Sequence, residues 1–218
     1  LVEHAVEVVS ISAPGRERRI DETPLTDMGA LVVEISQALQ ESGVVDGPPY
    51  AFFGHSLGAI VAHETARHLD ATLVPGRPRP IHLFASGHGS PITAVKARDG
   101  AGGDIPWGSL HDLGDEELVN AVSQFGFLPA ELLSDKKLMA VVLPTLRADF
   151  HVYETYVPEA ERKPLSISIS AFGGSDDDFV PVDQLDGWAA ETSAKLRGPH
   201  VFKGDHFFIN SVMDEVVG

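Results

Sequence analysis

Cysteine is absent from this chain of 218 residues. Its absence excludes disulfide bonds, thiolate metal ligands and a cysteine nucleophile, and it suits a reducing cytoplasm, where we expect the protein to act. No uninterrupted apolar stretch approaches the length of a transmembrane helix, so we expect no membrane partner. The hydrophobic content of 43% is nevertheless ordinary for a globular protein with one sizeable core.

Basic residues are also scarce, because 16 Lys and Arg residues face 32 Asp and Glu residues. The resulting net charge of −16 would repel phosphate groups and argues against nucleic acid as a partner. Of the ten histidines, only His63 and His68 approach the spacing of one helix face, and no His-Glu-x-x-His pattern occurs. The sequence therefore predicts no metal site and no cofactor.

The most informative motif is Gly54-x-Ser56-x-Gly58, which lies between the short apolar run Ala51–Phe53 and a helical pattern over Leu57–Leu69. A reversal from strand to helix this sharp is expected to leave no room for side chains at the two flanking positions, and it places the serine at the tip of the turn. The pentapeptide alone is a weak signal, but its context favours the nucleophile elbow of α/β-hydrolases. Ser56 is therefore the candidate nucleophile.

A serine nucleophile needs a base and an orienting acid, which in this fold follow it in the order Asp or Glu, then His, at the ends of later strands. A strand is expected over Leu165–Phe172, and the loop after it contains Asp176-Asp177-Asp178. A second strand is expected over Pro199–Lys203, and His206 follows it. Taken singly, the aspartates indicate a solvated turn or a cation site, and the histidine indicates a core residue. Their order and positions together favour a Ser-His-Asp triad.

With these motifs the chain resembles the type II thioesterases, which are stand-alone editing hydrolases of polyketide and nonribosomal peptide synthesis. The resemblance covers nearly the whole chain. It implies that Asp177, rather than its two neighbours, is the acid of the triad. It rests on Gly-His-Ser-Leu-Gly-Ala at 54–59, Pro-Gly-Arg-Glu-Arg-Arg at 14–19, Gly-Gly-x-x-Asp-x-x-Val at 173–180, Gly-Asp-His-Phe-Phe at 204–208, Leu-Pro-Thr-Leu-Arg-Ala-Asp-Phe at 143–150 and Tyr-Glu-Thr-Tyr at 153–156.

The resemblance also implies an oxyanion hole built from backbone amides, one of which is the amide of Leu57. In the family, a Pro-His-Ala-Gly-Gly type loop after an earlier strand supplies the second donor. The chain opens just before a strand expected over Ala5–Ser12, and Gly87-His88-Gly89 follows a different strand. The second donor is therefore expected upstream of Leu1.

Strands that alternate with amphipathic helices predict an α/β protein with the α/β-hydrolase fold, in which a mostly parallel sheet carries helices on both faces. We expect residues 1–86 and 159–218 to form this core. Its further elements are expected at a helix over Met28–Ser42 and strands over Tyr50–Phe53 and Ile81–Ala85.

Residues 87–158 interrupt this alternation with helical patterns over Asp115–Phe125, Pro129–Leu133 and Asp135–Tyr156. We expect this insertion to form a helical lid over the active site. Its surplus of apolar residues predicts that some of them line an acyl channel, with Phe125 and Met139 as candidates. Packing on the core is the alternative for each of these residues.

The function implied by the resemblance is hydrolysis of acyl groups from the phosphopantetheine arm of acyl carrier or peptidyl carrier protein domains. Ser56 would attack the thioester carbonyl, His206 would take the serine proton and Asp177 would orient the imidazole. A chain-releasing thioesterase or a general carboxylesterase is the alternative within this class. A non-catalytic acyl-binding module is the alternative from another class.

Carrier proteins are typically acidic, so docking on this acidic chain would require a local basic patch. The candidate clusters are Arg16, Arg18 and Arg19, then Arg67, Arg77 and Arg79, then Lys96 and Arg98.

Overall fold

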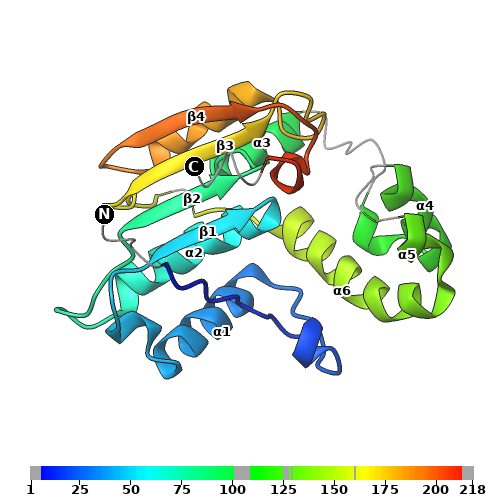
Figure 1. Ribbon diagram of the computed structural model, residues 1–218, viewed down its shortest axis with the longest axis horizontal. Helices are drawn as coiled ribbons and strands as arrows, with labels where there is room; N and C mark the ends of the chain where they lie inside the picture. The colour runs from blue at the N-terminus through cyan, green and yellow to red at the C-terminus, as the bar shows by residue number, and fades with distance from the viewer. Residues whose placement is uncertain (1–5, 101–108, 125–127, 129, 160, 213–218) are drawn as a thin grey trace.

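In the part of the chain that the structure describes, four parallel strands form one sheet in the order β1-β2-β3-β4 (Figure 1). The computed structural model describes residues 6–100, 109–124, 128, 130–159 and 161–212. Each strand begins within three residues of the start expected from the sequence. The strands are β1 (Ala51–His55), β2 (His82–Ser86), β3 (Ser168–Gly174) and β4 (Leu196–Phe202).

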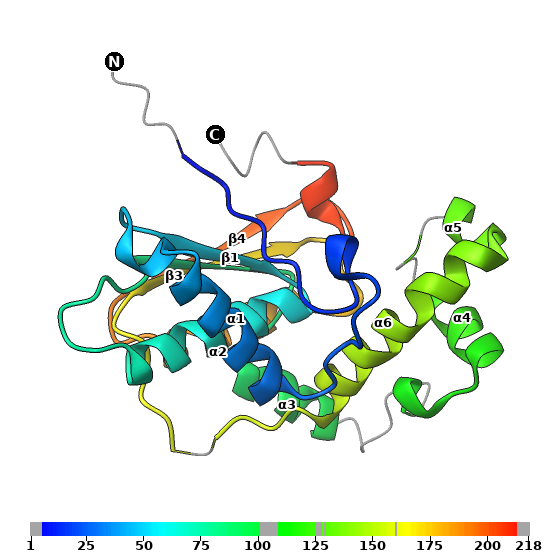
Figure 2. The same cartoon turned by 90° about the horizontal axis from the view of Figure 1, so that it is seen from below.

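The strand expected over Ala5–Ser12 is wrong in its described part, because residues 6–12 pair with no other described strand (Figure 2). Val6 and Val8 are each 84% exposed. The apolar character of the segment suits a strand, but a strand forms only where its backbone N–H and C=O groups find a partner. Among the described residues, the segment finds none.

Side-chain alternation decides which face of the sheet forms the main core. Leu83 of β2 and Ile169 of β3 are fully buried on the same face, which is the face that the helices cover (Figure 2). The covering elements are α1 (Met28–Glu41), α2 (Leu57–Thr72) and the 3-10 segment η4 (Val182–Glu191).

The opposite face of the sheet carries an aromatic cluster. Phe84, Phe172 and Phe202 come from three successive strands, and Phe208 packs against them from the 3-10 turn η5 (Phe208–Asn210). Among the described residues, η5 is the element that packs on this cluster.

Apolar periodicity and a capping residue set the first helix. Asp27 caps α1, since its carboxylate accepts a hydrogen bond of 2.8 Å from the Ala30 amide. The buried residues of α1 recur every three or four positions and pack against α2 and the sheet. They are Met28, Leu31, Val32, Ile35, Ser36 and Leu39.

The insertion lies between β2 and β3, and its last helix leads back to the core (Figure 1). Its elements are α3 (Pro91–Gly100), η3 (Leu110–Asp112), α4 (Asp115–Gln124), α5 (Ala130–Ser134) and α6 (Lys136–Thr155). The last three match the expected helices to within one or two residues. The sequence reasoning missed α3, although Ser90 followed by Pro91 is a signature of a helix start.

The insertion has a small hydrophobic cluster of its own, separate from the main core. It consists of Leu110, Leu118, Val122, Met139 and Leu143. Met139 is only 6% exposed there, whereas Phe125, the other channel candidate, lies outside the described residues.

None of the helices in the described part of the chain has the length and hydrophobicity that a bilayer crossing requires.

Two sequence motifs join the insertion to the core. Arg16 of the Pro-Gly-Arg segment forms an ion pair with Asp149 of α6. The hydroxyl of Thr145 donates a hydrogen bond of 2.7 Å to the carbonyl of Gly15. The two motifs at 14–19 and 143–150 therefore form one contact between the N-terminal part of the chain and α6.

A buried polar network fixes the end of α6 to α2. The hydroxyl of Tyr156 donates a hydrogen bond of 2.8 Å to Glu64, and Arg162 donates one of 3.1 Å to the same oxygen. Arg162 also forms an ion pair with Glu191 of η4. The network holds three segments together, and removal of one partner would leave a buried charge unpaired.

Truncation of Met139 to alanine should destabilise the protein, because the side chain fills the insertion cluster. We expect the free energy of unfolding to fall by about 2–3 kcal/mol. Leu138→Ala is the matched control, since Leu138 is the preceding residue and is 47% exposed. Its loss should stay within about 0.5 kcal/mol. Urea denaturation of both variants measures the difference, and equal losses would contradict the placement of Met139 in a core.

Candidate active site

Ser56 occupies the sharp turn between β1 and α2. Its backbone has φ 53° and ψ −129°, a conformation that residues other than glycine rarely adopt. Two backbone hydrogen bonds of 2.9 Å hold the turn, one from the Ser56 amide to the Ser86 carbonyl and one from the Ala59 amide to the Ser56 carbonyl. The structure therefore contains the strained strand-to-helix turn that the Gly-x-Ser-x-Gly motif predicts.

Crowding at this turn affects only one of the two glycines. A Cβ added at Gly54 would overlap the backbone of Gly58 and would lie 2.7 Å from the amide nitrogen of Ala59. A Cβ added at Gly58 would meet nothing within 4 Å. The expectation that neither flanking position has room is thus wrong for Gly58, because the first turn of α2 directs its open side away from β1.

The structure brings Ser56, Asp177 and His206 into one hydrogen-bonded chain. His206 Nε2 lies 2.9 Å from Ser56 Oγ, and His206 Nδ1 lies 2.8 Å from Asp177 Oδ2. Asp177 and His206 are 8% and 5% exposed. They come from the loops that follow β3 and β4, so the parallel strands deliver all three residues to the same edge of the sheet.

The Asp177 carboxylate divides its two oxygens between the backbone and His206. Oδ1 accepts hydrogen bonds of 2.9 Å and 3.0 Å from the amides of Phe179 and Val180, while Oδ2 faces the imidazole. Burial alone would raise the pKa of Asp177, but His206 and the two amides lower it below its ordinary value. Asp176 and Asp178 are exposed, so the loop turns only one of its three carboxylates inward.

Two residues that the sequence reasoning did not assign support His206 from β1 and β2. The ring of His55 lies 5.2 Å from the ring of His206, and its Nδ1 is 3.0 Å from Ser86 Oγ. Burial, with a smaller contribution from the nearby His206, lowers the pKa of His55 to about 4. Gly87 is required here, because its φ is +58° and a Cβ would lie 2.6 Å from His55 Cε1.

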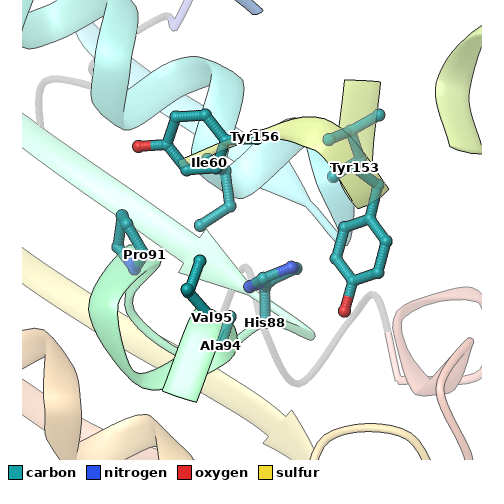
Figure 3. A pocket seen from close by; sticks show the side chains of 8 residues that line it. Ile60, His88, Pro91, Ala94, Val95, Tyr153 and Tyr156 are labelled. Atoms are coloured by element: carbon teal, nitrogen blue, oxygen red, sulfur yellow. The ribbon is translucent and has the colours of Figure 1, made fainter. Parts of the chain in front are cut away.

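Two spaces lie at the site or close to it. A cleft of about 2220 Å³ has Ser56 and His206 in its wall and extends along β1 and α6. A smaller apolar pocket lies beside Leu57, the residue after the nucleophile (Figure 3). Met139 lines neither space. The small pocket is lined by Leu57, Ile60, His88, Pro91, Ala94, Val95, Tyr153 and Tyr156.

The amide of Leu57 is placed to donate into the site. Leu57 is the first residue of α2, so its N–H has no acceptor within the helix, and the helix dipole favours negative charge at this end. The second oxyanion donor, expected upstream of Leu1, stays a prediction.

Among the described residues, no group of three or more His, Asp or Glu side chains is arranged to hold a metal ion.

Comparison with known proteins identifies the family. The family model described as the thioesterase domain matches residues 1–218. The chain belongs to the thioesterase family. The resemblance to type II thioesterases and the α/β-hydrolase fold class, both predicted from the sequence, are thereby confirmed.

Individual relatives agree with this assignment. The gramicidin S biosynthesis protein GrsT of Aneurinibacillus migulanus is 32% identical over 212 residues, which cover 97% of this thioesterase and 76% of the relative. The solved structure of RedJ, a thioesterase from the prodiginine pathway of Streptomyces coelicolor, has a TM-score of 0.79 and 31% identity, covering 95% and 75% of the two chains. The type II thioesterase BorB from the borrelidin cluster has a TM-score of 0.77 and 28% identity, covering 94% and 76%.

Gly54→Ala should disrupt the elbow, whereas Gly58→Ala should not. The new methyl group at position 54 would overlap backbone that cannot move without displacing Ser56. We expect Gly54→Ala to lose at least about 2 kcal/mol of stability, as overpacked sites do, together with most of its activity. Thermal unfolding and thioester hydrolysis measure the two effects. If Gly58→Ala were the more damaging substitution, the one-sided crowding described above would be refuted.

Proposed function

We propose that this thioesterase hydrolyses acyl groups from the phosphopantetheine arm of acyl carrier or peptidyl carrier protein domains, and so removes stalled or aberrant chains in polyketide or nonribosomal peptide synthesis. The observation that carries the proposal is the Ser56–His206–Asp177 chain at the elbow. The relatives support the proposal, because GrsT, RedJ and BorB are named for the biosynthesis of gramicidin S, prodiginine and borrelidin.

The geometry supports a two-step acyl transfer. Because the pKa of Asp177 is lowered, its carboxylate is ionised and accepts a hydrogen bond from the N–H of His206 Nδ1, which leaves Nε2 as the acceptor for the Ser56 hydroxyl. Ser56 Oγ attacks the thioester carbon while Nε2 takes its proton, and the same proton then leaves with the thiol. Water, deprotonated by His206, attacks the carbonyl carbon of the acyl-serine. The bond from this carbon to Ser56 Oγ then breaks, His206 returns the proton to Oγ, and the acid is released.

The thioester makes modest demands on the site. A thiol has a pKa near 8.5, so it leaves without the strong acid assistance that an amine or alkoxide needs. The main requirement is stabilisation of the negative oxygen in the tetrahedral intermediate. In our proposal the Leu57 amide at the start of α2 supplies one hydrogen bond, and the phosphopantetheine belongs to the substrate rather than to the enzyme.

In this proposal, residues 1–86 and 159–218 act as the core and residues 87–158 as the lid. The contacts of Arg16 with Asp149 and of Tyr156 with Glu64 support this division, since they attach the C-terminal half of α6 to the core, whereas its N-terminal half packs in the insertion cluster. The cleft at Ser56 has Phe150 and Tyr153 of α6 in its wall, which supports a substrate path along the last helix of the insertion.

Most of the basic residues considered for carrier docking form ion pairs with carboxylates of this chain. Arg16 pairs with Asp149, Arg19 with Glu22 and Glu34, Arg67 with Glu159, Arg77 with Asp46 and Arg79 with Asp70. In the described part of the chain, Arg18 and Lys96 are the members of these clusters without an ion pair. An acidic carrier would therefore meet these two charges most directly.

Ser56→Ala should abolish hydrolysis while the fold is retained. The hydroxyl contributes one hydrogen bond to His206, so we expect little change in unfolding temperature but a loss of at least about a thousandfold in turnover. Release of free thiol from an acyl carrier protein measures the rate, and the absence of cysteine in the enzyme removes its background. Ser175→Ala in an exposed loop is the control. Full activity of the Ser56 variant would refute the proposed nucleophile.

Replacement of the three neighbouring aspartates tests the choice of acid. Asp177→Asn should reduce turnover by about ten-thousandfold, because the amide cannot hold His206 in the required tautomer. Asp176→Asn and Asp178→Asn should stay within about tenfold of the unmodified enzyme, since both side chains are exposed. Steady-state kinetics with one acyl-carrier substrate separates them, and a severe loss at position 176 or 178 would overturn the assignment.

A further inference from the structure

His55 connects the candidate nucleophile to the candidate base by a route other than the hydrogen bond between them. It is the last residue of β1, so Ser56 follows it directly in the chain. Its ring also lies beside three successive residues of the turn after β4. The ring centroids are 5.2 Å apart for His206, 6.2 Å for Phe207 and 5.9 Å for Phe208, which are the separations of packed rings. A single side chain thus joins the elbow to the turn that carries His206.

The end of β2 fixes the His55 ring in place. His55 and Ser86 are paired residues of adjacent strands, and His55 Nδ1 lies 3.0 Å from the buried Ser86 hydroxyl oxygen. Gly87 packs closely on the ring, because a Cβ there would lie 2.6 Å from His55 Cε1. The main chain at this point is itself held by two hydrogen bonds of 2.9 Å, from the Gly87 amide to the Phe172 carbonyl and from the Ser56 amide to the Ser86 carbonyl.

A contact against the His206 ring matters because this base must reach one particular oxygen. Asp177 holds the imidazole at Nδ1, at 2.8 Å, and a bond at one nitrogen leaves the ring able to swing about that point. Nε2 lies across the ring from Nδ1, so such a swing would move it away from Ser56 Oγ, which is 2.9 Å distant. A misplacement of about 1 Å can slow a reaction about a hundredfold. A second contact on the ring restricts this motion.

Histidine suits this position better than other side chains of similar reach. Burial, with a smaller contribution from His206, lowers the pKa of His55 to about 4, so the ring is neutral near pH 7. A lysine or arginine would place a positive charge beside a base that gains a proton in the proposed mechanism. An aliphatic side chain would leave the buried Ser86 hydroxyl without its partner.

We propose that His55 is a positioning residue, which holds the turn 206–208 against the elbow so that His206 Nε2 stays within reach of Ser56 Oγ. It takes no part in proton transfer. The proposal rests on the proposed function, because it assigns a role in the same site. It implies that a change at Gly87 affects His206 only through the His55 ring.

His55→Ala should slow hydrolysis of the butyryl thioester of N-acetylcysteamine by about thirtyfold. We expect kcat and kcat/KM to fall equally, because the contact sets the geometry of reaction and not the binding of substrate. His82→Ala is the matched control. His82 also bonds to a serine hydroxyl of the next strand, with Nε2 2.9 Å from Ser170 Oγ, but it lies at the start of β2, whereas Ser86 is at its end. Its constants should stay within about twofold, and equal losses in the two variants would overturn the proposal.

A double-mutant cycle tests whether the effect passes through the ring. Gly87→Ala should lower kcat by about tenfold while His55 is present, because the new methyl group overlaps Cε1 and displaces the ring. In the His55→Ala background the methyl group meets no ring, so the same substitution should change kcat by less than about twofold. The strain of alanine at φ +58° is common to both backgrounds and cancels. Losses that simply add would refute the coupling.

Nitrogen NMR of the histidine rings separates this proposal from the proposed function, since it needs no substrate. His206, assigned by comparison with His206→Gln, should show one tautomer with the proton on Nδ1 in the unmodified protein and in His82→Ala. In His55→Ala it should show a mixture of both tautomers. If the unmodified protein hydrolyses no thioester, the proposed function fails, while the tautomers still decide the role of His55. If thioesters are hydrolysed but neither kcat nor the tautomer responds to His55→Ala, only the positioning proposal fails.

Discussion

The close approach of β1 and the first turn of α2 at Gly54 is the constraint on which the rest of the site depends. It allows the chain to reverse within one residue, which forces Ser56 into a positive φ and points its side chain out of the turn. The strand register then determines where the other two residues lie. His55 pairs with Ser86, and Gly174 pairs with Phe202, so the loops that carry Asp177 and His206 leave the sheet at the same edge as the candidate nucleophile. The candidate triad at positions 56, 177 and 206 therefore needs no long loop to bring it together.

The parts of the molecule that the sequence predicted well are those defined by short-range patterns. The elbow, the acid loop and the histidine each stand directly after an apolar strand, and parallel strands bring such positions together. Helices α1 and α6 begin one residue after aspartates that cap them, at Asp27 and Asp135. These features could be recognised because the residues that cause them are neighbours in the chain.

What the sequence did not predict depends on contacts between distant segments. The segment 6–12 has the composition of a strand, but pairing is a property of two segments and not of one. Met139 has the spacing of either a channel or a core residue, and only its neighbours Leu118 and Val122 place it in the insertion cluster. The sequence shows Gly87-His88-Gly89 only as a segment that follows a strand, and it indicates no role for His88. Its position in the pocket wall depends on Tyr153 and Tyr156, more than sixty residues later.

Burial also keeps the histidines near His206 neutral. In the proposed mechanism His206 becomes an imidazolium during acyl transfer, and a second positive charge nearby would oppose that step. His55 and His88 lie close enough for their charges to be felt at His206, yet burial holds the pKa of each at about 4. The carboxylate of Asp177, which is hydrogen-bonded to His206, favours the imidazolium. The buried aromatic and imidazole packing on this edge of the sheet thus contributes to the electrostatics of the site: it allows three histidines to gather there while only one of them takes up the proton.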